Sequence, residues 1–168
     1  MKQLIAIFSI LVLQACGTID YKPEKYEIDQ QRIQDFPVAG SVSVINLQQN
    51  KDKTLFFDGT SDWSGDYYTV SEHFSSQLRE EIAKHGKVSG TLEKSINVKI
   101  VRLEAKQKAF HFVSEMDVMV RLGQGKEFEL SVGQGSPGNM WRVLNGTLAI
   151  GVIELLKDKR VLDYLAAE

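Results

Sequence analysis

Residues 110–132, FHFVSEMDVMVRLGQGKEFELSV, decide the fold. Apart from Ser114, apolar side chains recur at every second position in both halves of this stretch, while the intervening positions are mostly polar. The apolar set is Phe110, Phe112, Met116, Val118, Val120, Leu122, Phe128, Leu130 and Val132. Alternation with a period of two predicts two β-strands that each have one apolar face.

The residues Gly123, Gln124 and Gly125 predict the turn between these strands. A three-residue loop places position 122 opposite position 126 and so pairs even positions with even positions. The same register sets Arg121 opposite Glu127, which is a favourable cross-strand pair. We therefore expect an antiparallel hairpin whose two apolar faces coincide.

Three further segments extend the sheet in the prediction. Residues 38–47 (VAGSVSVINL) alternate as a first strand, and residues 54–57 are short enough for an edge strand. Residues 95–104 change the phase of their apolar positions, and a β-bulge near Ile100 would reconcile the two phases. Turn residues at 58–66 predict a loop, and Trp63, Tyr67 and Tyr68 make the region 58–68 a candidate contact surface.

Two main helices are expected. The first begins at a capping box formed by Thr69 and Glu72, carries an apolar stripe at four-residue spacing, and ends before Gly86. The second covers residues 139–157 and is apolar on almost every side, so it should be the most buried helix. A short amphipathic helix follows around residues 161–165.

These segments predict an α/β (α+β) fold in the order β-α-β-β-β-α, followed by a short C-terminal helix. Strands with one apolar face require a cover, and helices with apolar stripes supply it. We expect a two-layer sandwich in which a largely antiparallel sheet of four or five strands is covered by the two main helices.

The beginning of the chain predicts where the protein goes. Lys2 precedes the apolar run LIAIFSILVL at residues 4–13, and a small residue, Ala15, precedes Cys16. A basic start, an apolar core of this length and a small residue at the cut site are typical of a secretory signal. The run is too short to span a bilayer, which takes about 20 residues.

The sequence Leu13-Gln14-Ala15-Cys16 resembles the lipobox of bacterial lipoproteins, with Gln14 as a mild departure. The resemblance implies cleavage before Cys16 and acylation of this cysteine, which would anchor the chain to a membrane. It divides the chain into a signal peptide at 1–15, a lipidated cysteine with an extended tether at 16–37, and one periplasmic domain at 38–168. Because Gly17 rather than Asp follows the cysteine, the outer membrane is favoured over the inner membrane.

The tether has one alternative. Residues 17–37 are polar and contain two of the three prolines, which favours an extended linker, but Tyr21, Tyr26, Ile28 and Ile33 could instead lie along the domain or a partner. Cleavage would leave 19 basic and 22 acidic residues, a net charge of −3. This balance provides no basic field for nucleic acid.

No catalytic set, cofactor site or metal site is predicted. Residues 133–138 match G-x-G-x-x-G but lack the second parallel strand of a dinucleotide site. Asp58, Asp62 and Asp66 alternate as in a calcium loop, yet Trp63 and Thr69 stand where glycine and glutamate are needed. The chain has three histidines without metal-ligand spacing, His73, His85 and His111.

The signal and the order of elements resemble the YajG-type lipoproteins of Gram-negative bacteria. The likeness rests on VSVINL, FSSQLREEIAKHG, INVKIVRLEA and NMWRVLNGTLAIGVIELLKD and covers most of residues 40–165. It implies an outer-membrane-anchored periplasmic domain. We therefore expect a non-enzymatic interaction or assembly module of the cell envelope with an envelope protein as its partner. The alternative is an accessory component of envelope transport that binds lipid or another apolar ligand.

Overall fold

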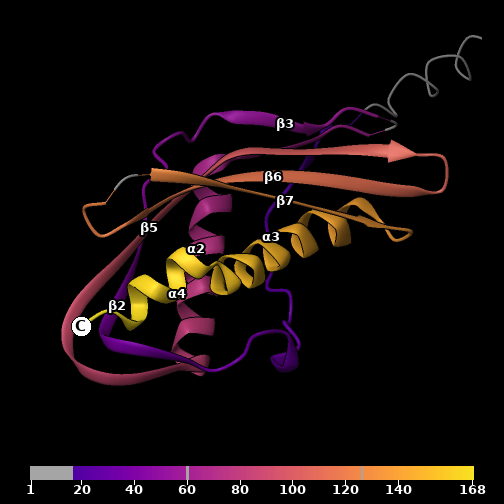
Figure 1. Cartoon of the computed structure of the whole chain (residues 1–168). Helices are drawn as coiled ribbons and strands as arrows, with labels where there is room; N and C mark the ends of the chain where they lie inside the picture. The colour runs from indigo at the N-terminus through magenta and orange to yellow at the C-terminus, as the bar shows by residue number, and fades with distance from the viewer. Residues whose placement is uncertain (1–16, 60, 126) are drawn as a thin grey trace, which may run out of the picture.

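The computed structural model describes residues 17–59, 61–125 and 127–168. Three helices and seven strands follow one another along these residues (Figure 1). Their order is β1 (Ile19–Asp20), the 3-10 turn η1 (Gln30–Arg32), β2 (Phe36–Asn46), β3 (Lys53–Phe57), β4 (Trp63–Asp66), α2 (Tyr67–His85), β5 (Gly86–Lys108), β6 (His111–Leu122), β7 (Glu127–Ser136), α3 (Met140–Lys157) and α4 (Lys159–Ala166). The predicted order reappears as β2, α2, β5, β6, β7, α3 and α4.

The main sheet has four strands in the order β2-β5-β6-β7. β5, β6 and β7 form the predicted antiparallel meander, whereas β2 runs parallel to β5. The connection between these parallel strands contains α2. The predicted α+β class is confirmed, and the main sheet is largely antiparallel with one parallel pair, β2 and β5.

A second, three-stranded sheet has the order β1-β4-β3. It corrects the expectation of a loop throughout residues 58–66, because Trp63–Asp66 forms strand β4. β4 pairs with β3 on one side and with β1 on the other, so that a segment from the predicted tether contributes a strand. The four residues of β4 are too few to show a periodic pattern of apolar side chains, so the sequence did not predict this strand.

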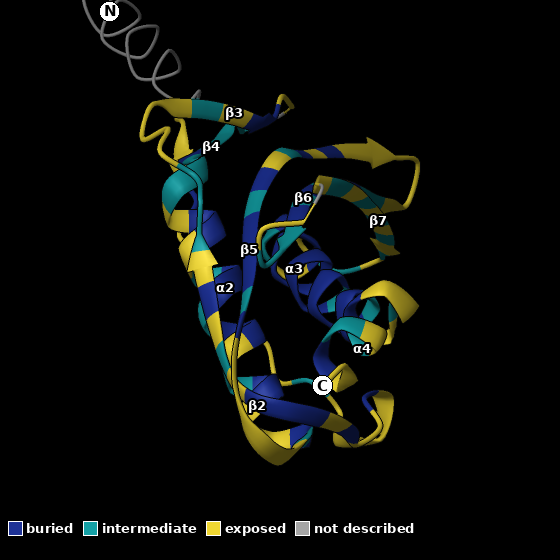
Figure 2. Ribbon diagram, turned by 60° about the vertical axis from the view of Figure 1, so that its left-hand side comes forward, coloured by how far each residue is buried: buried dark blue, intermediate teal, exposed yellow. Residues whose placement is uncertain are grey.

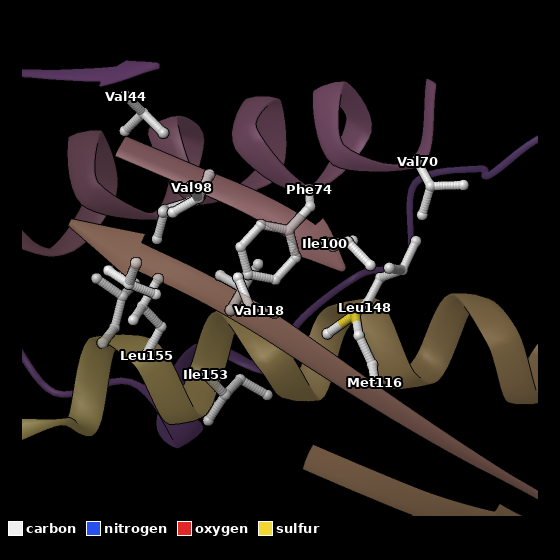
Figure 3. Close-up of a cluster of buried hydrophobic side chains, with 14 of the residues drawn as sticks. Val44, Val70, Phe74, Val98, Ile100, Met116, Val118, Leu148, Ile153 and Leu155 are labelled. Carbon is white, nitrogen blue, oxygen red and sulfur yellow. The ribbon is translucent and has the colours of Figure 1, made fainter. Parts of the chain in front are cut away.

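Helices α2 and α3 each cover a different half of the main sheet. α2 packs against β2 and β5, α3 packs against β6 and β7, and the two helices contact each other. Figure 2 shows their buried faces turned toward the strands and their exposed faces turned outward. The shared core contains Phe74 from α2, Leu148 from α3, and Ile100 and Val118 from the sheet (Figure 3). The predicted sandwich therefore buries one continuous core.

The predicted hairpin between β6 and β7 is confirmed. Val120 pairs with Phe128 and Arg121 pairs with Glu127, in the register expected from the three-residue turn. The Arg121 Nη1 atom lies 3.8 Å from the Glu127 Oε1 atom. Gly123 has a φ angle of 56°, a left-handed conformation that glycine adopts without strain.

Strand β5 is much longer than the predicted 95–104 segment. Its first part pairs with β2 and its second part pairs with β6, and the predicted bulge is present between Ile100 and Arg102. Residues 86–94 carry few apolar side chains, so their strand conformation depends on hydrogen bonds to β2 rather than on an apolar face. Phe110 also differs from the prediction, because it lies in the turn between β5 and β6 and not in a strand.

Helix α2 begins two residues earlier than its predicted capping box. The Asp66 carboxylate accepts a hydrogen bond from the Thr69 backbone N–H at 2.6 Å, so Asp66 and not Thr69 is the N-cap. The predicted stripe of Phe74, Leu78 and Ile82 is buried, and the helix ends before Gly86 as expected.

Helix α3 is buried along most of its length, as its composition predicts. A Cβ atom built on Gly151 would lie 2.4 Å from the Met116 Cε atom and 2.9 Å from the Phe74 Cε2 atom, which shows how closely this helix approaches its neighbours. Among the residues that the structure describes, no helix combines the length and apolar character needed to cross a membrane.

Candidate functional site

The predicted lipid-bearing residue, Cys16, and the predicted signal at 1–15 lie outside the described residues. The description begins at Gly17, which is exposed, and β1 follows almost at once. Ile19 pairs with Trp63, and the Ile19 backbone N–H donates to the Asp62 carbonyl oxygen at 2.7 Å. The first described residues are therefore held against β4.

Residues 17–35, which we term the strap, lie along the domain in place of the extended tether that their composition favours. Tyr21 and Ile33 are buried, and Ile28 packs against the core from its surface. The alternative reading of the apolar residues in this segment thus describes the structure. A packed strap gives the domain a defined orientation relative to Gly17.

Asn145 of α3 holds the first half of the strap. Its side-chain oxygen accepts hydrogen bonds from the Tyr21 hydroxyl and from the Glu24 backbone N–H, both at 2.9 Å. Its amide nitrogen donates to the Trp141 carbonyl oxygen at 3.0 Å. Asn145 is buried, so each of these bonds satisfies a polar group that water does not reach. Burial also raises the pKa of the Tyr21 hydroxyl well above its ordinary value.

Helix α2 holds the middle of the strap. The Gln77 side-chain amide donates to the Tyr26 carbonyl oxygen at 2.6 Å. Lys25 forms an ion pair with Glu80 at 2.5 Å, and this contact lowers the pKa of the Glu80 carboxyl. The strap therefore bridges α2 and α3, the two helices that cover the sheet.

The end of the strap contacts a titratable cluster at the C-terminal end of α2. His85 lies between two carboxylates, with its Nδ1 atom 3.4 Å from Asp35 and its Nε2 atom 3.6 Å from Glu81. Lys84 lies 2.6 Å from Glu81, and Lys87 lies 3.0 Å from Asp35. The Lys87 contact, assisted by His85, lowers the pKa of the Asp35 carboxyl. The His85 Nδ1 atom is within hydrogen-bonding distance of Asp35, whereas the His85 Nε2 atom and the Glu81 Oε2 atom are buried without a hydrogen-bond partner in the described part of the chain.

The other sequence candidates do not assemble into one centre. Asp62 accepts the β1 hydrogen bond through its backbone, and Asp66 caps α2. The three histidines lie at separate places, with His73 in the first half of α2, His85 at its end and His111 at the start of β6. Within the described ranges, no group of three or more metal-ligating side chains has a geometry suited to a metal ion.

The glycine-rich residues 133–138 serve packing between β7 and α3. Gly133 and Gly135 lie within β7, which ends at Ser136. The Gln134 side chain between them donates to the Val143 carbonyl oxygen at 2.7 Å and covers Gly146 of α3. Most of this segment is therefore strand that packs on a helix, because β7 continues through Ser136.

Two surface hollows in the described part of the chain have volumes of about 530 and 510 Å³. One lies between β3 and the end of β5, and the other lies between the strap and the junction of α3 and α4. The space between α3 and the sheet is instead filled by side chains such as Met116 and Phe74.

An apolar bulge at the beginning of β5 provides a candidate interaction surface. The register between β2 and β5 shifts between Val38 and Gly40, so that residues 89–91 have no partners in β2. Gly90 has a φ angle of 109°, which glycine allows and other residues rarely adopt. Val88 is 67% exposed and Leu92 is 45% exposed. We term residues 88–92 the distal bulge.

Sequence comparisons yield no relative, since no known protein-family profile and no curated protein matches the chain. Among solved structures, the chain resembles protein XCC0632 from Xanthomonas campestris, a protein of family DUF330. The TM-score is 0.52 with 7% sequence identity, over 88% of this chain and 95% of that chain. The hypothetical protein CT253 from Chlamydia trachomatis aligns with a TM-score of 0.46 and 11% identity, over 80% of this chain and 99% of that chain. At such identities the likeness to XCC0632 concerns the fold alone.

The sequence did not predict the roles of the exposed residues in the distal bulge or of Asn145, which holds the strap. Val88 and Leu92 flank Ser-Gly-Thr, a turn-like stretch whose apolar neighbours have no periodic pattern. Asn145 offered a clearer signal, because it is an amide in an otherwise apolar helix and a buried amide needs partners. Its partners, Tyr21 and Glu24, could not be identified without the tertiary structure.

Proposed function

We propose that the chain is a lipoprotein anchored through Cys16 to the outer membrane and facing the periplasm, where it acts as a non-enzymatic interaction module of the cell envelope. The signal-like residues 1–15 and the lipobox-like Leu13-Gln14-Ala15-Cys16 support the anchor. The finer assignment to the YajG-type lipoproteins belongs to this proposal and rests on the signal and the element order.

One observation carries the proposal, namely that the first described residues and the distal bulge lie at opposite ends of the domain. β1 lies beside β4, α2 begins directly after β4, and β5 begins directly after α2. Figure 2 shows β4 and β2 near opposite ends of α2. The 19 residues of α2 therefore separate the two ends by about 28 Å at 1.5 Å per residue. An anchor at Cys16 would place the distal bulge away from the membrane, in reach of a second protein.

The distal bulge has the chemistry of a protein contact. Val88 and Leu92 expose apolar surface that water solvates poorly, and their neighbours Ser89 and Thr91 supply hydroxyl groups. Gly90 fixes the shape of the bulge through its φ angle of 109°. We propose an envelope protein as the partner, bound through these residues and through the adjoining edge of the sheet.

Cross-linking in intact cells tests the partner. We expect Val88→Asp and Leu92→Asp to reduce recovery of the cross-linked partner at least tenfold, because each places a charge in the apolar contact. Leu55→Asp is the matched control, since Leu55 is also exposed but lies in β3 near the opposite end. Equal recovery from all three variants, or a chain that never acquires a partner, would refute the proposal.

The anchor has a separate test. Metabolic labelling with a radioactive fatty acid should label the wild-type chain and leave the Cys16→Ser variant unlabelled and unprocessed. Labelling of the Cys16→Ser variant would show that the lipid is attached elsewhere and would refute the anchor assignment.

A further inference from the structure

The turn between β5 and β6 carries the most exposed apolar side chain among the large hydrophobic residues described. Phe110 is 91% exposed. Lys108 and His111 form the last pair of the two strands, so only Ala109 and Phe110 make the turn. Every residue from Lys106 to His111 is exposed. A narrow turn of this kind projects its apex side chain into the surroundings instead of covering a neighbouring surface.

Lys106 and Lys108 place positive charge beside the apex on β5, and residues 106–111 contain no acidic side chain. Asp58 lines the same surface hollow as these two lysines. Neither lysine forms an ion pair with any residue in the described ranges. The nearest acidic residues along the strands, Glu104 and Glu115, are instead paired with Arg102. We term residues 106–111 the basic tip.

The basic tip lies at the same end of the domain as β1. Phe112, which follows the tip, lines the same surface hollow as Ile19 of β1. The Phe112 ring also meets the Phe57 ring edge to face, with 5.9 Å between their centroids. Figure 1 shows the turn between β5 and β6 and the start of the described chain on the same side, away from the distal bulge.

We propose that the basic tip is a second membrane contact, in which Phe110 enters the interface of a bilayer that contains anionic phospholipid while Lys106 and Lys108 face the headgroups. An exposed ring above lysine side chains is suited to this boundary, because the ring leaves water and the ammonium groups stay near phosphates. A protein interface would need roughly 800 Å² on each partner, which a two-residue turn cannot supply. The inference rests on the proposed anchor, which brings this end of the domain to a membrane.

Two contacts with one bilayer would fix how the domain stands. A single acylated residue leaves the domain free to tilt, whereas a second contact at the tip restricts the tilt. Because the strap is packed rather than extended, the distal bulge would then keep a constant distance from the bilayer.

Full-length protein reconstituted in vesicles tests the proposal with two independent measurements. Flotation of the vesicles reports whether the chain is attached at all. Tryptophan quenching by brominated lipid, measured on a Phe110→Trp variant relative to wild type, reports whether the tip enters the bilayer. The wild type supplies the background from Trp63 and Trp141. A Leu92→Trp variant in the distal bulge is the control.

The vesicles contain about 30% phosphatidylglycerol, which makes their surface anionic. In these vesicles we expect the quenching of Phe110→Trp to be at least three times that of Leu92→Trp. Adding Lys106→Glu and Lys108→Glu should lower it by at least half. These positions are exposed, so circular dichroism should be unchanged. Chains that float while Phe110→Trp stays unquenched would refute the tip contact. Chains that fail to float would refute the anchor. In that case, quenching of the Phe110→Trp variant when it is mixed with the same vesicles would still support the membrane contact of the basic tip.

Discussion

The Tyr21 hydroxyl donates a hydrogen bond to the Asn145 side-chain oxygen at 2.9 Å, although 124 residues separate the two along the chain. Tyr21 belongs to the strap and Asn145 to the most buried helix, so this bond connects the beginning of the described chain to its core. Both side chains are almost fully buried. The relationship explains why a segment with the composition of a linker is a packed part of the domain.

Removal of Asn145 should destabilise the protein more than removal of the Tyr21 hydroxyl. Asn145→Ala leaves the buried Tyr21 hydroxyl without its acceptor, which costs about 1–3 kcal/mol. It also removes the hydrogen bond to the backbone N–H of the exposed residue Glu24. Tyr21→Phe removes one hydrogen bond, worth about 1 kcal/mol. Urea unfolding of both single variants and the double variant gives the coupling energy. Strictly additive effects would show that the two side chains do not stabilise each other.

The burial of Tyr21 predicts a loss of stability in alkaline solution. Burial raises its pKa in the folded state, so the folded chain keeps the phenol proton at pH values where the unfolded chain loses it. The stabilisation is complete below the ordinary tyrosine pKa of about 10 and decreases as the pH rises above it. Stability measured from pH 8 to 11 should therefore fall, and Tyr21→Phe should make the decrease smaller. An unchanged slope in that variant would assign the effect to other groups.

The Arg102–Asp117 pair predicts a loss of stability in acid. The Arg102 Nε atom lies 2.5 Å from Asp117, and this hydrogen bond is the main reason that the pKa of the Asp117 carboxyl is lowered. A lowered pKa stabilises the fold above the ordinary aspartate value and loses that effect as the pH falls through the folded-state value. Asp117→Asn should therefore flatten the stability profile below about pH 4. Glu127→Gln is the control, because its pair with Arg121 is longer and exposed; an equal change in both variants would contradict the assignment.

Gly151 should tolerate no larger side chain. A Cβ atom there would meet Met116 at 2.4 Å and Phe74 at 2.9 Å, so Gly151→Val should cost about 1–3 kcal/mol through overpacking. Thermal unfolding measures the effect. Gly17→Val is the control, because no atom lies within 4 Å of the corresponding Cβ position. The combined variant with Met116→Ala should recover part of the loss, and a failure to recover would argue against steric conflict as the cause.

Local periodicity was sufficient for the elements with one apolar face. The β6–β7 register follows from the parity of the apolar positions and from the length of the turn, since a shift by one residue would turn each apolar side chain toward solvent. The stripe of Phe74, Leu78 and Ile82 predicted α2 for the same reason. Such patterns record burial within a few residues of chain, and the structure confirms them.

Periodicity was insufficient where pairing partners are distant. Residues 86–94 and β4 are strands because of the neighbours β2, β1 and β3, and their own side chains alternate weakly. Phe110 illustrates the opposite error, since its parity matches β6 but it lies in the turn that precedes this strand. A pattern of apolar residues reports a preference for burial and does not show where a turn interrupts the strand.

The sequence by itself determined the α+β class, the order of the main elements, the β6–β7 register and the bulge near Ile100, and from it alone comes the expectation that Cys16 carries a lipid. Only the tertiary structure decided that the strap is packed, that Asn145 holds it, and that the distal bulge and the basic tip lie at opposite ends. The physical reason is the range of each interaction. Side-chain alternation is a property of neighbouring residues and can be seen in the sequence. The partners of Tyr21 and the exposure of Phe110 depend on chain segments that meet only on folding.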